Sequence, residues 1–184
     1  MTAGAYPLLG VAKLPNVTIA SPGEVWSNLR ANGVIIPGAA IFPLSVGGKL
    51  RAKQVAAADA PDLNQVGVAL RQVEIPDTNT GPGALGPNEI VNQAIADGDY
   101  LRRYMTGVLH LTLVDPRADY LPGQKIGWAP AGDRPTGKAA GTGSWTNVVA
   151  DQKAGTVLFE VFEYRPYGAS DEGILTVRFL RSNQ

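Results

Sequence analysis

Short apolar runs separated by glycine and proline limit the folds open to this chain more than any other feature of its sequence. The 184 residues include 22 glycines and 14 prolines, and most of the apolar runs between them are shorter than an ordinary helix. Glycine and proline at this density mark turns, and many turns between short apolar runs are typical of sheet proteins. We therefore expect an all-β chain that forms a β-barrel or a β-sandwich.

The segment from Gly107 to Ala131 shows this pattern most clearly. Leucines recur at every second position from 109 to 113, which is the period of a strand with one face in a core. The proline of Asp115-Pro116 ends this strand, because it has no amide proton for the sheet ladder. In residues 121–124, LPGQ, proline and glycine stand where a type II turn prefers them. The segment predicts a strand, a corner, a turn and a second strand.

The same reasoning predicts strands elsewhere in the chain. Gly47-Gly48 is a two-residue hairpin signal, because glycine adopts positive φ without strain. The last two apolar runs alternate in matching phase, so we expect them to pair as a closing hairpin. The further predicted strands are residues 34–36, 39–44, 49–55, 65–75, 125–128, 145–149, 156–164 and 174–181.

Two segments carry helix signals. In residues 21–24, SPGE, serine, proline and glutamate take the N-cap, first-turn and capping-box positions, and Asn32-Gly33 is a stop signal. A short helix is predicted between them. Residues 87–96 predict a second short helix, inside a loop-helix segment inserted at 76–99. Insertions of this length in a β-domain are usually functional or serve as interaction elements.

The first 20 residues are predicted to form an extended arm. They mix apolar side chains with two prolines, contain no acidic residue and keep no regular apolar period. Two alternatives stay open: the arm buries its apolar residues on a neighbouring molecule, or it forms a first strand on its own domain. The expected organisation is an arm and short helix at 1–32 and a β-barrel or sandwich domain at 33–184. The candidate contact residues of the arm are Tyr6, Leu8, Leu9, Leu14 and Ile19.

Charge balance and the lack of cysteine argue against several functions. Sixteen basic and sixteen acidic residues cancel, so no long-range field steers the protein to nucleic acid or to an anionic membrane. Without cysteine there is no disulfide, thiolate metal site or cysteine nucleophile. The chain begins without a basic segment followed by an apolar one, and no apolar run approaches membrane-spanning length. We expect no nucleic-acid partner, no membrane partner and no secretory export.

Two glycine-rich stretches match nucleotide-binding motifs only in part. Residues 81–86 fit the dinucleotide fingerprint, but a polar loop precedes them, and arginines stand near the position of the acid that would hold the ribose. Residues 132–138 match the start of a phosphate-binding loop, but Ala139 replaces the hydroxyl residue that ligates magnesium. We expect neither stretch to bind a nucleotide, and we predict no cofactor.

We expect no catalytic residue and no metal site. His110 is the only histidine, and one imidazole without cysteine or a second histidine makes a poor metal site. The carboxylate pairs are Asp97/Asp99, Asp115/Asp119 and Asp171/Glu172. They lie at predicted turns and lack the spaced ligands of a calcium loop. The tryptophans, expected as core or interface anchors with a sugar-binding platform as the alternative, are Trp26, Trp128 and Trp145.

Three pieces of the sequence resemble the head decoration, or cement, proteins of tailed bacteriophages. They are Ile36 to Ile41 (IPGAAI), Gly67 to Leu70 (GVAL) and Tyr104 to Gly132, which contains LPGQKIGWAPAG. The resemblance covers residues 33–184, and the insertion at 76–99 departs from the family pattern. It implies a β-barrel or sandwich module that sits on the outside of an icosahedral capsid, bridges major capsid proteins and has no enzymatic activity.

This resemblance sets the functional expectation. The protein is expected to be a structural virion protein that stabilises the shell, with the major capsid protein and other copies of itself as partners. Its expected location is the capsid exterior, and the host cytoplasm during assembly. The alternative is a carbohydrate- or receptor-binding β-sandwich module of a phage tail or fibre. The candidate interface residues outside the arm are Trp26, Leu85 and Ile90.

Overall fold

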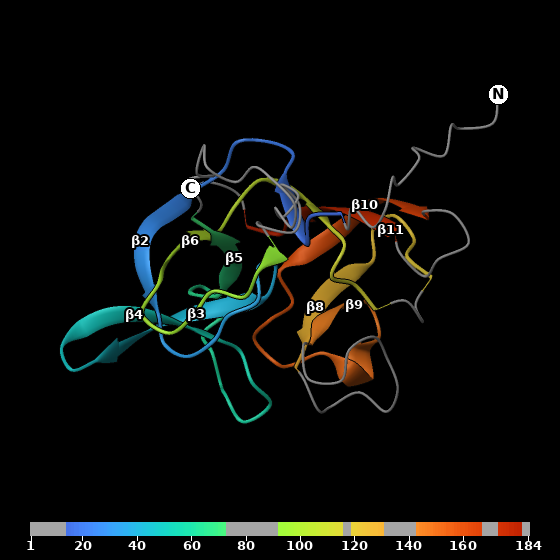
Figure 1. Ribbon diagram of the computed structural model, residues 1–184. Helices are drawn as coiled ribbons and strands as arrows, with labels where there is room; N and C mark the ends of the chain where they lie inside the picture. The colour runs from blue at the N-terminus through green and yellow to red at the C-terminus, as the bar shows by residue number, and fades with distance from the viewer. Residues whose placement is uncertain (1–13, 73–91, 116–118, 131–142, 167–172, 182–184) are drawn as a thin grey trace, which may run out of the picture.

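A computed structural model describes residues 14–72, 92–115, 119–130, 143–166 and 173–181 (Figure 1). In these residues, eleven strands and one 3₁₀ turn make up the regular structure. The strands form a closed five-stranded barrel and a six-stranded sheet. Figure 1 shows the barrel on the left and the sheet on the right. The all-β class predicted from the sequence is confirmed.

The barrel consists of β2 (Val25–Ala31), β3 (Ala40–Val46), β4 (Lys49–Gln54), β5 (Gly67–Arg71) and β6 (Tyr100–Tyr104). Their order around the barrel is β2-β4-β3-β5-β6, and β6 pairs with β2 to close it. β2 runs parallel to β4, whereas the other neighbours are antiparallel. Gly47 and Gly48 make the predicted hairpin turn between β3 and β4, with φ of 56° and 74°.

The sheet has the strand order β1-β7-β11-β10-β8-β9, and all of its pairs are antiparallel. Its strands are β1 (Val17–Ile19), β7 (Val108–Leu111), β8 (Lys125–Ala129), β9 (Ser144–Thr146), β10 (Phe159–Pro166) and β11 (Gly173–Phe179). β10 and β11 are the predicted closing hairpin, with Phe159 opposite Phe179 and Val161 opposite Val177. The 3₁₀ turn, Val149–Asp151, lies between β9 and β10.

Two apolar clusters hold the structure together. The smaller one fills the barrel and consists of Leu29, Ala31, Ile35, Ile41, Ala52, Ala69, Ile95 and Leu101. The larger one lies where the barrel wall meets the sheet. It combines barrel residues such as Val68 and Tyr104 with sheet residues such as Leu109, Trp145 and Val177. The barrel and the sheet therefore share one core.

A row of aromatic rings runs through this shared core. Trp128 packs on Trp145 with a centroid distance of 5.2 Å, and Trp145 packs on Phe159 at 4.7 Å. Phe159 contacts Phe179 at 4.5 Å, and Phe179 reaches Tyr104 of the barrel at 5.9 Å. The tilted and edge-on arrangements of these rings are the favoured ones for aromatic pairs. The row links sheet strands β8, β9, β10 and β11 to barrel strand β6.

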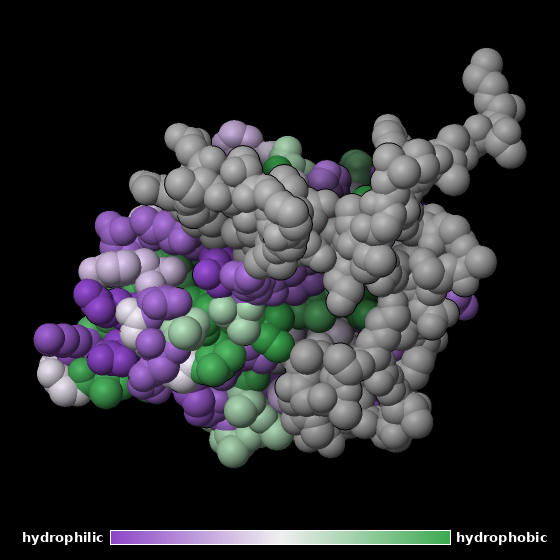
Figure 2. Space-filling model, viewed as in Figure 1, coloured by the Kyte–Doolittle hydropathy of each residue, from purple (hydrophilic) through white to green (hydrophobic). Residues whose placement is uncertain are grey.

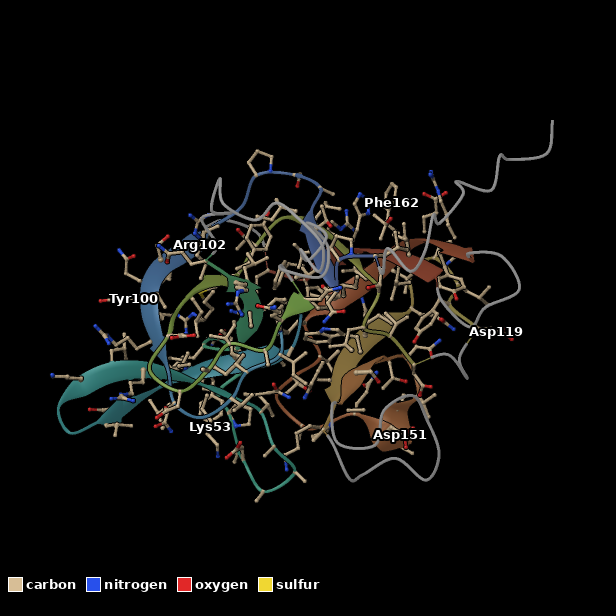
Figure 3. The ribbon with its side chains drawn as sticks, viewed as in Figure 1. Lys53, Tyr100, Arg102, Asp119, Asp151 and Phe162 are labelled. Atoms are coloured by element: carbon tan, nitrogen blue, oxygen red, sulfur yellow. The ribbon has the colours of Figure 1, made fainter. Side chains whose placement is uncertain are left out.

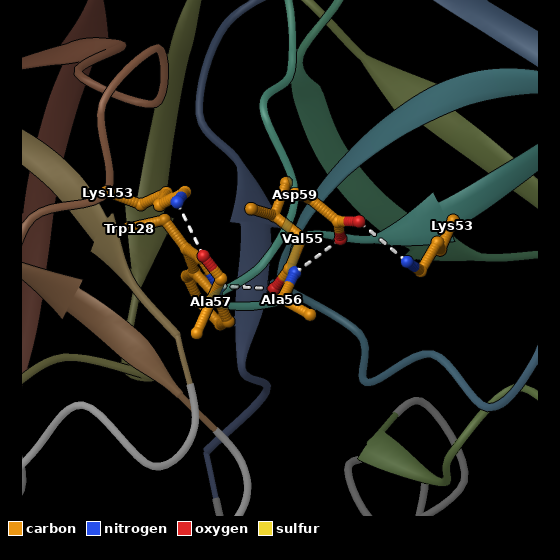
Figure 4. A network of polar contacts seen from close by, with 7 residues as sticks. All are labelled: Lys53, Val55, Ala56, Ala57, Asp59, Trp128 and Lys153. Carbon is orange, nitrogen blue, oxygen red and sulfur yellow. Dashed lines mark hydrogen bonds and ion pairs between the residues drawn. The ribbon is translucent and has the colours of Figure 1, made fainter.

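The Lys53–Asp59 pair orders the loop after β4 (Figure 4). Lys53 Nζ lies 2.7 Å from Asp59 Oδ1, and the amide of Ala56 donates to Asp59 Oδ2 at 2.7 Å. Burial acts to raise the pKa of Asp59, but the hydrogen bonds from Lys53 and Ala56 outweigh it and leave this pKa below its usual value. The carboxylate therefore stays charged at neutral pH and fixes the loop.

The same loop joins the barrel to the sheet (Figure 4). The Trp128 indole of β8 donates to the Val55 carbonyl at 3.3 Å, and Lys153 Nζ donates to the Ala57 carbonyl. In addition, the Trp145 indole of β9 donates to a barrel carbonyl, that of Gly38, at 2.6 Å. Polar groups as well as the aromatic row thus fix the barrel against the sheet.

The helix predicted between Ser21 and Asn32 is wrong, because β2 occupies this stretch. The side chains expected to cap a helix accept other hydrogen bonds, Ser21 Oγ from the Val108 amide at 3.0 Å and Glu24 Oε1 from the Trp26 indole at 2.9 Å. The Glu24 backbone bonds to the residues just after β6. The Glu24 amide donates to Thr106 Oγ1 at 2.7 Å, and the Glu24 carbonyl accepts from the Met105 amide at 2.9 Å. A register shift between Trp26 and Leu29 interrupts the pairing with β6 and hides the strand period.

The remaining predictions of local structure divide into three groups. The turn at 121–124 is confirmed by a φ of 86° at Gly123 and a hydrogen bond from Gln124 N to Leu121 O of 3.2 Å. The strand expected at 34–36 is only a bridge between Ile35 and Ile95. Of the helix expected at 87–96, residues 87–91 lie outside the described residues, and the described residues 93–96 are not helical but contain Ile95 of that bridge.

The described part of the N-terminal arm lies on its own domain. Val17–Ile19 form β1 and pair with β7, and the Leu14 carbonyl accepts from Asn92 Nδ2 at 2.8 Å. Of the two alternatives for the arm, the first-strand alternative therefore holds for these residues. Ile19 is exposed and Leu14 is half-buried. Tyr6, Leu8 and Leu9 lie outside the described residues.

Candidate binding site at the open end of the barrel

The two ends of the barrel differ. At one end Ile35 and Ile95, which follow β2 and precede β6, exchange two backbone hydrogen bonds of 3.0 and 2.8 Å and are buried with the barrel core. The opposite end, where β2 and β4 begin and β3 and β6 finish, is open. We call this open end the barrel mouth.

The barrel mouth is a hollow of about 440 Å³. Its lining residues are Trp26, Pro43, Leu44, Ser45, Leu50, Asn64, Gln65, Arg103 and Met105. They come from β2, β3, β4, the segment before β5, β6 and the residue just after β6. Mouths of β-barrels are common places for ligands, since side chains from several strands converge there.

Strand alternation explains how these side chains reach the mouth. On β6, Leu101 belongs to the barrel core, so Arg103, two residues on, points to the same interior. Tyr100 and Arg102, the alternate residues, project from the outside of the barrel (Figure 3). On β4, Leu50 is likewise in phase with a core alanine. The mouth is a continuation of the barrel interior.

Arg103 forms the floor of the mouth. Only 2% of its surface is exposed, although it carries a charge. Its Nη1 donates to the Gln65 carbonyl at 2.8 Å, and its guanidinium carbon lies 4.6 Å from the ring centroid of Trp26, its cross-strand partner. Its Nε is buried and has no hydrogen-bond partner. Within the described part of the chain, Arg103 forms no ion pair.

The electrostatics of the mouth are set by two arginines. Burial lowers the pKa of Arg103, the charge of Arg181 lowers it further, and Glu24 opposes both. Arginine nevertheless stays protonated in proteins. Arg181 donates to the carbonyls of Leu63, Asn64 (3.0 Å) and Val66 (2.7 Å). The two guanidiniums thus hold the segment before β5 in place. In the part of the chain that the structure describes, Arg103 is the only charged residue that lines the mouth.

Apolar side chains surround the mouth. Trp26 and Leu50 line it and are 45% and 53% exposed. Val46 and Leu63, which neighbour lining residues in the chain, are also exposed. Figure 2 shows hydrophobic residues at the surface of the barrel half, between hydrophilic ones. Exposed apolar side chains around a buried charge are typical of a site that binds another molecule.

A second hollow of about 490 Å³ lies on the sheet, and its charged side chains, Glu160, Arg178 and Arg181, all form hydrogen bonds. Glu160, one of its lining residues, accepts hydrogen bonds from Arg178 at 3.3 Å and from Lys125 at 2.7 Å. His110 is also engaged, with Nδ1 lying 3.0 Å from Thr176 Oγ1. These groups stabilise the outer face of the sheet. The barrel mouth is therefore the stronger candidate site.

The structure separates the tryptophans. Trp128 and Trp145 are fully buried in the shared core, as expected of core anchors, whereas Trp26 lies exposed at the mouth. Trp26 is thus the one predicted interface residue that the structure brings to the candidate site. Ile19 lies elsewhere, at the end of β1, and Leu14 lies before β1. Leu85 and Ile90 lie outside the described residues.

Sequence reasoning missed Arg103 and Leu50 as site residues. Arg103 stands next to Arg102, and a pair of arginines beside a turn-rich segment reads as solvated surface. The available signal was the strand period from Leu101, which puts Arg103 on the buried face. Leu50 lies between Lys49 and Arg51 and was hidden in the same way.

The motifs weighed for other chemistry add nothing to this site. Residues 81–86 and 132–138 lie outside the described residues. Among the described residues, no group of three histidine, aspartate or glutamate side chains is placed to hold a metal ion. In the same residues no helix has both the length and the apolar character to cross a membrane. The chain matches no protein-family model, no curated protein and no solved structure.

Proposed function

We propose that this protein is a structural virion protein that binds the outside of an icosahedral phage head and stabilises the shell, with the barrel mouth as a contact surface. The observation that carries the proposal is the exposure of Trp26 and Leu50 at a mouth whose floor is a buried arginine. Tryptophan and arginine are the residues that most often dominate protein interfaces. The family resemblance in residues 33–184 supplies the class of partner.

Burial of the rim would provide the binding energy. Covering a leucine-sized side chain contributes about 1.5–3 kcal/mol, and repetition over a shell multiplies a modest contact. The proposed partners are the major capsid protein and other copies of this chain. The proposed location is the capsid exterior. In this proposal the protein acts by adhesion and performs no reaction.

A second function is favoured by one observation. Ser45, Asn64 and Gln65 lie at the same mouth as Trp26, and an exposed indole beside hydroxyl and amide groups is suited to a sugar ring. This arrangement supports a carbohydrate- or receptor-binding module of a phage tail or fibre. A glycan array distinguishes the two functions, because only the second predicts saturable, Trp26-dependent binding to a glycan.

We expect the protein to co-sediment with purified heads that lack it and to raise the temperature at which those heads release their DNA. Trp26→Ser and Leu50→Ser should each weaken this binding about tenfold, the effect of losing roughly 1.4 kcal/mol of contact energy. The measurement is a sedimentation titration. Both side chains are exposed, so each variant should keep its Tm within about 4 °C of the original.

The matched control is Phe162→Ser. Phe162 is 68% exposed at a register shift of β10, on the sheet rather than at the mouth (Figure 3). Its replacement should leave binding unchanged. Failure of the unaltered protein to bind heads at micromolar concentration would refute the proposed function. Deletion of residues 1–13 tests the arm separately, because it leaves β1 intact.

A further inference from the structure

Arg103 has an incomplete set of partners for a buried charge. A guanidinium has five N–H donors, and a buried one normally meets a carboxylate or several carbonyls. Among the described residues, Arg103 has one hydrogen bond, to the Gln65 carbonyl, and packs on the face of Trp26, while its Nε has no partner. The Nε of neighbouring Arg181 is likewise buried without a partner among the described residues, but this arginine donates to three carbonyls. The mouth thus contains donors that an incoming group can satisfy.

We propose that the barrel mouth binds an extended protein segment that presents a single carboxylate to Arg103 and apolar side chains to Trp26 and Leu50. The proposed function supplies only the identity of the protein that carries this segment. The chemistry of the segment follows from the mouth itself. It is an aspartate or glutamate flanked by residues such as leucine, isoleucine or phenylalanine.

The lining selects a carboxylate rather than a phosphate. Phosphate sites gather several cations or backbone amides, whereas Arg103 is the only charged residue among the described residues that line this mouth. The remaining walls are largely apolar, from Trp26, Pro43, Leu44, Leu50 and Met105. A carboxylate matches one guanidinium in charge and shape, and flanking apolar side chains match the walls.

The N-terminal arm of this chain does not have a carboxylate to offer Arg103. Residues 1–20 contain Lys13 and no acidic residue, so the arm of a second copy would bring a positive charge toward Arg103. Like charges brought together in a site with little water oppose binding. Charge complementarity therefore argues against the arm of a second copy as the occupant of the mouth.

The test uses synthetic ten-residue peptides with blocked termini and the full-length protein. Three sets of peptides have Asp, Asn or Lys at one central position. The flanking positions vary among leucine, isoleucine, phenylalanine and serine, and they are the same in all three sets. Binding is followed through the fluorescence of Trp26, since Trp128 and Trp145 are fully buried. A bound peptide should shift the emission to shorter wavelength and protect it from acrylamide.

We expect the best Asp peptides to bind at least about tenfold more tightly than their Asn counterparts, because a charge-assisted hydrogen bond is lost in the latter. Lys peptides should not bind. Binding should weaken as salt is raised, and replacing the apolar neighbours by serine should abolish it. In an anisotropy assay with labelled peptide, Leu50→Ser should weaken binding and Phe162→Ser should not.

Arg103→Met should remove the preference for Asp over Asn. Because Arg103 is buried, this variant can fail to fold, and Leu50→Ser then provides the test. Equal affinity for the Asp and Asn sets, absence of binding at millimolar peptide, or binding unaffected by Leu50→Ser would each overturn the proposal. Peptide binding without head binding would refute the proposed function alone. Head binding that Leu50→Ser weakens, with no peptide binding, would refute this inference alone.

Discussion

Replacing Trp145 with alanine is expected to lower the free energy of unfolding by about 4 kcal/mol, a large share of the stability of a domain this size. Trp145 is fully buried, packs edge-on against Trp128 and Phe159, and donates its indole N–H to Gly38 of the barrel at 2.6 Å. Alanine would leave a cavity in the shared core and an unpaired carbonyl. Urea denaturation followed by circular dichroism measures the effect.

Trp26→Ala is the matched control for this prediction. It removes the same side chain from a site that is 45% exposed, so it should change the unfolding free energy by about 1 kcal/mol or less. A loss of less than about 1 kcal/mol for Trp145→Ala would mean that the barrel and the sheet do not share the aromatic core.

Replacing Gly107 with alanine is expected to lower the free energy of unfolding by about 3 kcal/mol, through backbone strain and overpacking together. Gly107 carries the chain from β6 of the barrel to β7 of the sheet with a φ of 101°. An added Cβ would lie 2.6 Å from the Tyr104 hydroxyl and 2.9 Å from the Pro22 carbonyl oxygen. The Tyr104 side chain does not move freely, because it is buried and its hydroxyl donates to the Ser21 carbonyl.

Gly123→Ala separates the two causes. Gly123 has a φ of 86°, but an added Cβ there would meet nothing within 4 Å. This variant should therefore show the strain alone, about 1–2 kcal/mol. Equal losses for the two variants, again from urea denaturation, would show that crowding at the junction between β6 and β7 is not significant.

Local pattern predicted much of this fold. Leucines at alternate positions from 109 to 113, the Gly47-Gly48 turn and the matched phases of the last two strands depend on neighbours in sequence, and each led to a correct local prediction. Closure of the barrel depends on residues far apart, such as Arg30 opposite Tyr100, and no short pattern encodes it.

The false helix at residues 21–32 has the same origin. The residues have the composition of a helix cap, but a short helix is marginal without packing, and pairing with β6 and β4 places this stretch in the barrel instead. The candidate site was predictable only at Trp26. Arg103 reads as surface until β6 is known to turn it into the barrel, and its missing partners appear only in three dimensions.

The most direct test of the account places a photoreactive phenylalanine analogue at position 26 or at position 162 and irradiates the protein bound to purified heads. The account predicts a crosslink to the major capsid protein from position 26, at the barrel mouth, and none from position 162, on the sheet. Crosslinking from position 162 with none from position 26 would contradict it.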